Sequence, residues 1–281
     1  MSAIPAIAAA PIGRRVSTLR TAAAAALVVL AIPAIALLSG RAGIAPDFAA
    51  RLLPPALAHP FGTDPLGRDM LFRTIKGLAL SLQVGLVASL LSVLIATALA
   101  LLGATSRWAD EVVGFLVETV MGLPHIVLLI LIAFALGGGT GAVIVAVAVT
   151  HWPRLTRILR AEILQLRSAD YVRISRRFGK SWFWIGRRHM LPHLLPQMLV
   201  GLLLLFPHAI LHEAALSFLG FGIEPARPAI GILLNEAMGY LLAGRWWLGL
   251  FPGLCLVGLV LCFDAIGNGA RAMLDPRASE D

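Results

Sequence analysis

Residues 77–106 contain no charged side chain, and this charge-free run constrains the fold more than any other feature. As a helix the run would be about 45 Å long, enough to cross the roughly 30 Å hydrocarbon core of a bilayer. Of the chain's 281 residues, 59% are hydrophobic and 14% are charged, whereas soluble domains have about 25% charged residues. With a mean hydropathy of +0.87, the sequence predicts an all-α, polytopic membrane protein.

Six segments are long and apolar enough to be expected as transmembrane helices. Residues 119–153 carry no formal charge, but 35 residues are too many for one crossing, and glycines at 137–139 and 141 predict a turn between two spans. The first segment could be a signal peptide, yet its length and the spans that follow favour a retained anchor. The expected spans are residues 19–38, 77–106, 112–136, 142–159, 194–213 and 246–263.

The connection between the fourth and fifth spans is strongly basic. Residues 154–193 hold ten Lys or Arg residues and two acidic residues. Because short loops rich in Lys and Arg remain on the cytoplasmic side, we expect this loop in the cytoplasm. With six spans, both termini then lie there too. No basic face is interleaved with aromatic residues for base stacking, so lipid rather than nucleic acid is the expected surrounding.

The same loop has the pattern of an amphipathic helix. Between Tyr171 and Pro192, apolar residues recur at three- and four-residue steps with basic residues between them. One interpretation is a helix at the headgroup surface, and the other is a helix that docks into a groove of a soluble partner. Gly179 predicts a bend between two helical pieces, and Pro192 predicts the end of the second piece.

Four ionisable residues inside the expected spans are candidates for a substrate path: His125, His208, His212 and Glu213. His208 and His212 are four residues apart, so a helix places them on one face. Imidazoles with a nearby carboxylate suit nickel or zinc, which predicts a transient metal site at His208 and His212. The alternative is hydrogen bonding between helices or at headgroup level. His151, His189 and His193 are expected to have no metal role.

Several separated motifs carry a family resemblance. Gly179 and the Leu191-Pro192 pair have the spacing of the coupling-loop signature of ATP-binding-cassette import permeases. Further segments resemble the peptide and nickel branch of these permeases: residues 59–69, 214–222, 251–254 and 274–277. The resemblance covers residue 59 to the C-terminus. In one place the chain departs from the family, because Arg173, Ile174 and Ser175 replace the acidic residue and alanines expected before the glycine.

The resemblance implies a division of labour between subunits. Residues 1–58 would form an N-terminal cytoplasmic tail, the first transmembrane helix and a periplasmic segment, and residues 59–281 a permease domain with five helices and a coupling loop at about 160–193. In the bacterial inner membrane it would join a homologous second permease, two cytoplasmic ATP-binding subunits and a periplasmic solute-binding protein. The residues implied to contact the ATPase are Tyr171, Arg173, Ser175, Phe178, Gly179, Leu191 and Pro192.

The expected role is transport rather than catalysis. The sequence has no phosphate-binding Gly-x-x-x-x-Gly-Lys-[Ser/Thr], so no cofactor is expected on this chain, and ATP with magnesium would bind the partners. An intramembrane enzyme would need a nucleophile with a base, paired intramembrane aspartates or a complete zinc motif, and the sequence contains none of these. A purely structural scaffold would have no need of a helix that docks onto an ATPase. Residues 206–213 favour nickel or a metal chelate as solute. The alternative is a di- or oligopeptide.

Overall fold

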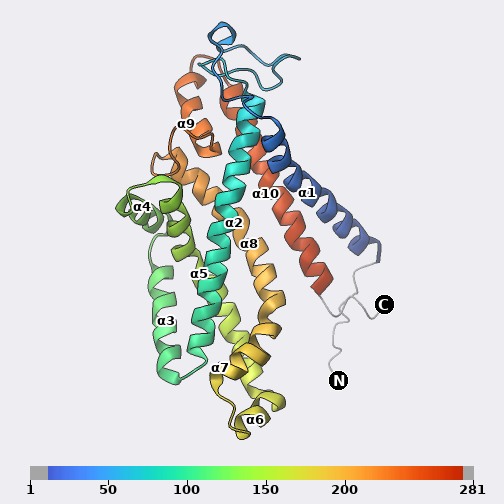
Figure 1. Cartoon of the computed structure of the whole chain (residues 1–281), viewed down its shortest axis with the longest axis vertical. Coiled ribbons are helices and arrows are strands. Elements are labelled where there is room, and N and C mark those ends of the chain that lie inside the picture. Colours follow the sequence, from blue (N-terminus) through green and yellow to red (C-terminus); the bar gives the residue numbers. More distant parts are fainter. Residues whose placement is uncertain (1–11, 275–281) are drawn as a thin grey trace, which may run out of the picture.

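The structure, a computed structural model, describes residues 12–274 as a bundle of helices (Figure 1). Outside the helices, the described residues form two isolated β-bridges and no sheet. The elements in chain order are α1 (Ile12–Leu38), the 3₁₀ turn η1 (Phe48–Ala50), α2 (Met70–Gly103), α3 (Arg107–Gly122), α4 (His125–Ala135), α5 (Gly139–Ser168), α6 (Asp170–Arg177), α7 (Trp182–Ile185), the π-helical turn η2 (Gly186–Met190), α8 (Leu191–Phe218), α9 (Ile230–Leu241) and α10 (Trp247–Leu274).

The expected all-α membrane fold is confirmed. Five helical stretches are long and apolar enough to cross a bilayer, and the bent pair α3 and α4 makes a sixth. The turn predicted between the third and fourth spans is present, because the backbone takes positive φ at Gly137, Gly138 and Gly139. The sequence motif at residues 275–277 and the expected N-terminal tail at residues 1–11 lie outside the described part of the chain.

The third span was predicted as one helix, and this prediction was wrong. The chain bends by 97° between α3 and α4. Leu123, at the bend, has extended backbone angles of φ −88° and ψ 144°, as expected for a residue that precedes a proline. Pro124 also has no N–H to donate to the preceding turn, so the helix ends and restarts in a new direction.

Small residues let the central helix α2 pack closely. α2 lies along α5 and α8, and α1 lies against α10 at the edge of the bundle (Figure 1). A Cβ atom on Gly85 would come within 2.8 Å of the Ile210 side chain, so α8 could not approach as closely if residue 85 were larger. Small side chains at helix contacts are typical of membrane bundles, where packing replaces the hydrophobic drive of water. The outward faces remain apolar, as at Leu27 and Leu30 of α1.

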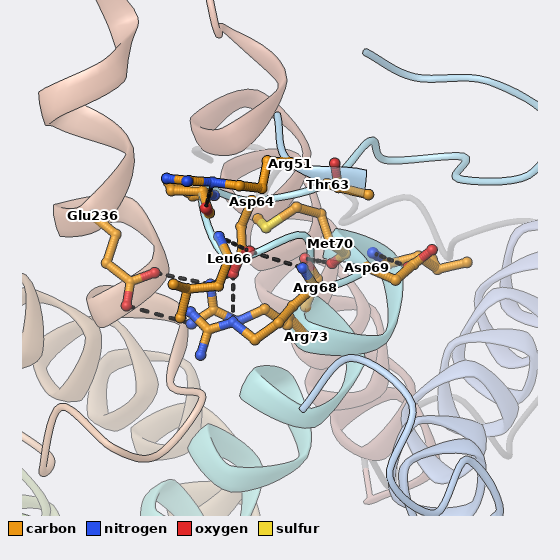
Figure 2. A network of polar contacts seen from close by, with 12 residues as sticks. Arg51, Thr63, Asp64, Leu66, Arg68, Asp69, Met70, Arg73 and Glu236 are labelled. Atoms are coloured by element: carbon orange, nitrogen blue, oxygen red, sulfur yellow. Dashed lines mark hydrogen bonds and ion pairs between the residues drawn. The ribbon is translucent and has the colours of Figure 1, made fainter. Parts of the chain in front are cut away.

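An ion-pair network fixes the connection between α1 and α2 to the rest of the bundle (Figure 2). Asp64 is buried and accepts hydrogen bonds from Arg68 Nε at 2.6 Å and Arg73 Nη1 at 2.7 Å. Arg73 Nη1 also donates to Glu236 of α9 at 2.8 Å. Because buried charges need partners, this network holds the segment at residues 39–69 onto α2 and α9. α9 itself was not predicted, since its 12 residues are too few to span a bilayer.

At the opposite end of the bundle, the basic loop folds into α6, a tight turn and α7. Gly179 has φ +77°, and the amides of Gly179 and Lys180 donate to the carbonyls of Arg176 and Ser175 at 2.9 and 3.1 Å. This pair of bonds is a Schellman motif, which needs a left-handed residue that glycine supplies without strain. The bend predicted at Gly179 is therefore confirmed.

Pro192 does not end the helical piece that precedes it, and that prediction was wrong. The helical chain continues from α7 through η2 into α8, where Pro192 stands in the first turn. In the π-helical turn the Leu191 amide donates to the Gly186 carbonyl, five residues back. A proline is tolerated in the first turn of a helix, because its missing N–H has no obligatory partner there.

Candidate functional site

A cavity of about 490 Å³ opens at the break between α3 and α4. Irregular backbone at membrane depth is tolerated where it lines a cavity, and broken helices often mark solute sites in transporters. The lining comes from α3 and its C-cap, α4, α5 and α8: Val120, Met121, Leu123, His125, Thr150, His151, Pro153, Arg154, Leu155, Ile158, Gly201, Leu204, Leu205, His208 and His212.

Three histidines from three helices converge in this cavity. His125 is the first residue of α4, His151 lies in α5, and His212 lies in α8. Their ring centroids are 4.6 Å (His125 to His151), 4.8 Å (His125 to His212) and 5.0 Å (His151 to His212) apart. One nitrogen from each ring lies within 4.8 Å of the chosen nitrogens of the other two, so the three rings together can offer ligands to one ion.

The position of His151 is fixed by its own helix. Its Nδ1 lies 2.9 Å from the Val147 carbonyl oxygen, which can only accept, so Nδ1 carries the proton and donates it. The other nitrogen, Nε2, therefore has a free lone pair. It is buried and has no hydrogen-bond partner among the described residues. A buried acceptor that the protein leaves without a partner is able to take one from a bound group.

The histidine group differs from the pair expected from the sequence. His208 lines the same cavity as His212, but its Nδ1 lies 3.1 Å from the Leu204 carbonyl, and it is not part of the convergent group. His151, for which no metal role was expected, takes its place. The reason is that helices α4 and α5 bring distant residues together, which a spacing of four along one helix cannot indicate.

Glu213 does not line the cavity, contrary to the expectation that it would stand beside His212. It is fully buried elsewhere in the bundle, and its Oε1 accepts a hydrogen bond from Ser217 Oγ at 2.9 Å. Consecutive residues of a helix point about 100° apart, so a ligand face that includes His212 turns its neighbour away. Of the lining residues only Arg154 carries a full charge, and none carries a carboxylate.

The coupling loop has a packed inner side and an outer side on which exposed aromatic residues stand among exposed basic ones. Val172 and Ile185 are buried, while Phe178 and Phe183 are about 80% exposed. Of the residues implied to contact the ATPase, Tyr171, Arg173, Ser175, Phe178 and Gly179 lie on α6 and its turn, and Leu191 and Pro192 begin α8.

Within this loop the structure gives a packing role to Trp184, which the sequence did not single out, and to His189, for which only the absence of a metal role was expected. Ser175 Oγ lies 3.1 Å from His189 Nε2, and the His189 ring packs 5.2 Å from that of Trp184. The Tyr171 ring packs 5.4 Å from that of His189. Together these contacts tie α6 to α7 and η2.

A polytopic helix bundle whose broken span lines a cavity has the architecture of a membrane transport protein. Residues 88–280 match the family model described as the binding-protein-dependent transport system inner membrane component. The chain therefore belongs to this family and is the permease subunit of an ATP-binding-cassette importer, a transport component rather than an enzyme.

Several characterised or named proteins are similar to this chain. It is 36% identical over 226 residues to the dipeptide transport system permease protein DppC of Bacillus subtilis, covering 80% of this chain and 71% of that protein. It is 39% identical over 227 residues to a putative peptide transport system permease protein of Brucella suis, covering 81% and 76%.

Two solved transporters share the fold. The inward-facing MetNI methionine transporter has a TM-score of 0.59, with 20% identity over 73% of this chain and 98% of that one. An amino acid transporter solved with histidines has a TM-score of 0.53, with 20% identity over 69% and 91%. Both are ATP-binding-cassette transporters, and what they share with this chain is the fold. The nickel preference inferred from residues 206–213 finds no support in the named relatives, which are peptide permeases.

Proposed function

We propose that this permease forms half of the inner-membrane path for di- or oligopeptides. The sequence analysis left these solutes open as the alternative to nickel or a metal chelate. The observation that carries the proposal is the similarity to peptide permeases over four-fifths of the chain. The cavity agrees with it, because about 490 Å³ lies within the range of roughly 300–1,000 Å³ usual for small-molecule sites. Arg154 offers a guanidinium to a peptide carboxylate.

In this proposal, ATP hydrolysis reaches the path through the coupling loop. The residues Tyr171, Arg173, Ser175, Phe178 and Gly179, with the start of α8 at Leu191 and Pro192, would form the contact with an ATP-binding subunit. Exposed aromatic side chains on a short helical knuckle suit a groove in a partner. α6 lies past the end of α3 (Figure 1), which favours a soluble partner over the headgroup surface.

The orientation follows from the same assignment. The α6–α7 end would face the cytoplasm together with both termini, and residues 39–69 would face the periplasm. There the segment held by the Asp64 network would meet the solute-binding protein, and a homologous second permease would complete the path. ATP with magnesium would bind only the partner ATPases.

Uptake of a labelled dipeptide and of labelled nickel, in cells with and without this chain, tests the substrate. We expect dipeptide uptake to fall to background without the chain and to return when it is supplied again. Nickel uptake in the absence of peptide should not change. Loss of nickel uptake alone, with dipeptide uptake intact, would overturn the proposal. Nickel would then again be the favoured solute, as the sequence analysis expected.

A further inference from the structure

The three convergent imidazoles are arranged so that they can close on an ion. Nitrogen ligands lie about 2.0–2.1 Å from a bound zinc-like ion, which in a tetrahedral site places two ligands roughly 3.3 Å apart. The chosen nitrogens of His125, His151 and His212 lie within 4.8 Å of one another, so small rotations of the rings would suffice. No hydrogen bond within the described part of the chain holds the His125 or His212 ring in place.

His151 has the hydrogen bonding of a metal ligand before any metal is present. Ligating histidines usually donate the second ring nitrogen to a carbonyl or carboxylate, which fixes the ring and its tautomer. The Val147 carbonyl fills this role at 2.9 Å. The free nitrogen, Nε2, is buried and unpartnered in the described residues, and a metal ion would satisfy it. This orphaned lone pair is an observation independent of the clustering.

The charge of the cavity indicates what would accompany the ion. The lining supplies imidazoles and the cationic Arg154, with no carboxylate to offset a divalent ion. A metal bound by a peptide brings its own negative charge, since the peptide carboxylate is ionised. That carboxylate can pair with Arg154, which forms no ion pair with any described residue. Three protein ligands also leave coordination positions open for the peptide.

We propose that His125, His151 and His212 bind a divalent transition-metal ion that enters as a complex with a peptide, whose carboxylate pairs with Arg154. Imidazole ligands suit borderline ions of the zinc, copper and nickel type. The proposal rests on the proposed peptide path and adds one solute class to it. Binding is weak and transient, because a path that held its solute tightly would not release it.

The test uses the permease purified with its partner subunits in lipid nanodiscs, with Co²⁺ as the probe. The visible absorption of Co²⁺ reports its ligands and gives the dissociation constant. We expect Co²⁺ binding by the parent complex, and binding about tenfold tighter when one equivalent of glycylglycine is present. His151→Gln should weaken both at least about tenfold, and His125→Gln, at a less buried position, provides a second variant if the first fails to fold.

Matched controls separate the three ligands from the other histidines. His208→Gln, in the same cavity, and His193→Gln, on the surface, should leave Co²⁺ affinity within about twofold. Arg154→Gln should leave binding of Co²⁺ alone unchanged but remove the gain from glycylglycine. Equal affinity in the parent, His125→Gln and His151→Gln complexes would overturn the site. Equal losses in the two control variants would also overturn it, since the ion would then bind adventitiously.

The peptide carrier is tested separately from the ion. If glycylglycine gives no gain, or if the gain survives Arg154→Gln, the proposal of a metal–peptide complex is overturned. Dipeptide uptake in the presence of a metal chelator tests the peptide path alone. Uptake that persists without any Co²⁺ binding would overturn this inference and leave the proposed function intact, whereas Co²⁺ binding without dipeptide uptake would overturn the proposed function.

Discussion

Replacing Asp64 by Asn tests whether the buried ion pairs hold residues 39–69 in place. Asp64 is 1% exposed and accepts four hydrogen bonds. Its Oδ1 accepts from the amides of Leu66 and Arg68, each at 2.8 Å. Its Oδ2 accepts from the guanidinium groups of Arg68 and Arg73 (Figure 2). Asn removes the charge and points an NH₂ group or a single oxygen at two cations.

The expected loss is at the lower end of the range for a broken buried pair. Removing one partner of such a pair destabilises a protein by about 3–5 kcal/mol. Arg73 keeps Glu236 at 2.8 Å, and the Arg68 side chain is 21% exposed and can turn toward water. We therefore expect the free energy needed to open this segment to fall by about 3 kcal/mol. The open population would then rise roughly a hundredfold.

Hydrogen exchange of backbone amides measures this opening directly. The amides of Leu52 and Asp64 donate to carbonyls within the segment at 3.1 and 3.0 Å. They should exchange roughly a hundredfold faster in Asp64→Asn, while amides in the middle of α5 should not change. As a control, Glu111→Gln removes an exposed ion-pair partner of Arg107. This change should alter the local free energy of opening by no more than about 0.5 kcal/mol. Exchange at Leu52 and Asp64 within threefold of the parent would refute the argument.

Three further changes probe other parts of the structure. Gly179→Val should add about 1–2 kcal/mol of backbone strain at φ +77° and lower dipeptide uptake severalfold. Membrane insertion, measured by fractionation, should stay intact. Unchanged uptake would contradict the assignment of this turn to docking. Gly231→Ala would drive a Cβ into the Ala214 carbonyl oxygen, so thermal unfolding in detergent should show a loss of about 1–3 kcal/mol in stability. An unchanged midpoint would contradict that contact. Arg160→Met removes hydrogen bonds of 2.6 and 2.9 Å to the half-exposed Asp110. Hydrogen exchange at the start of α3 should show the free energy of opening lowered by only about 1 kcal/mol. A decrease above about 3 kcal/mol would show that the pair is effectively buried.

Features that depend on local sequence could be predicted, because local physical chemistry decides them. Most of the charge-free run, residues 77–103, forms the apolar part of α2, since a lipid-spanning segment must satisfy its own backbone hydrogen bonds. The glycines at 137–139 and Gly179 marked turns, since each adopts a positive φ. The family motifs were likewise local, and they indicated the permease family.

Features that depend on contacts between distant segments could not be predicted in the same way. His125 and His151 are joined by no pattern in the sequence, and only the fold brings their rings to 4.6 Å. The break in the third span was hidden because hydropathy averages over Leu123 and Pro124. Pro124 was the available signal, because a proline inside an expected helix indicates a bend or an end. The spacing of His208 and His212 was visible, but His208 is not part of the group of convergent rings.

The packing of α5 connects the coupling loop with the cavity. The buried loop residues Val172 and Ile185 belong to the same hydrophobic cluster as Trp152 and Leu155. Trp152 directly follows His151, and Leu155 itself lines the cavity. Protein interiors are close-packed and have little room to absorb a displacement, so α6 and α7 cannot move far without repacking the residues around the histidines. The same buried cluster therefore joins the coupling loop to the wall of the cavity.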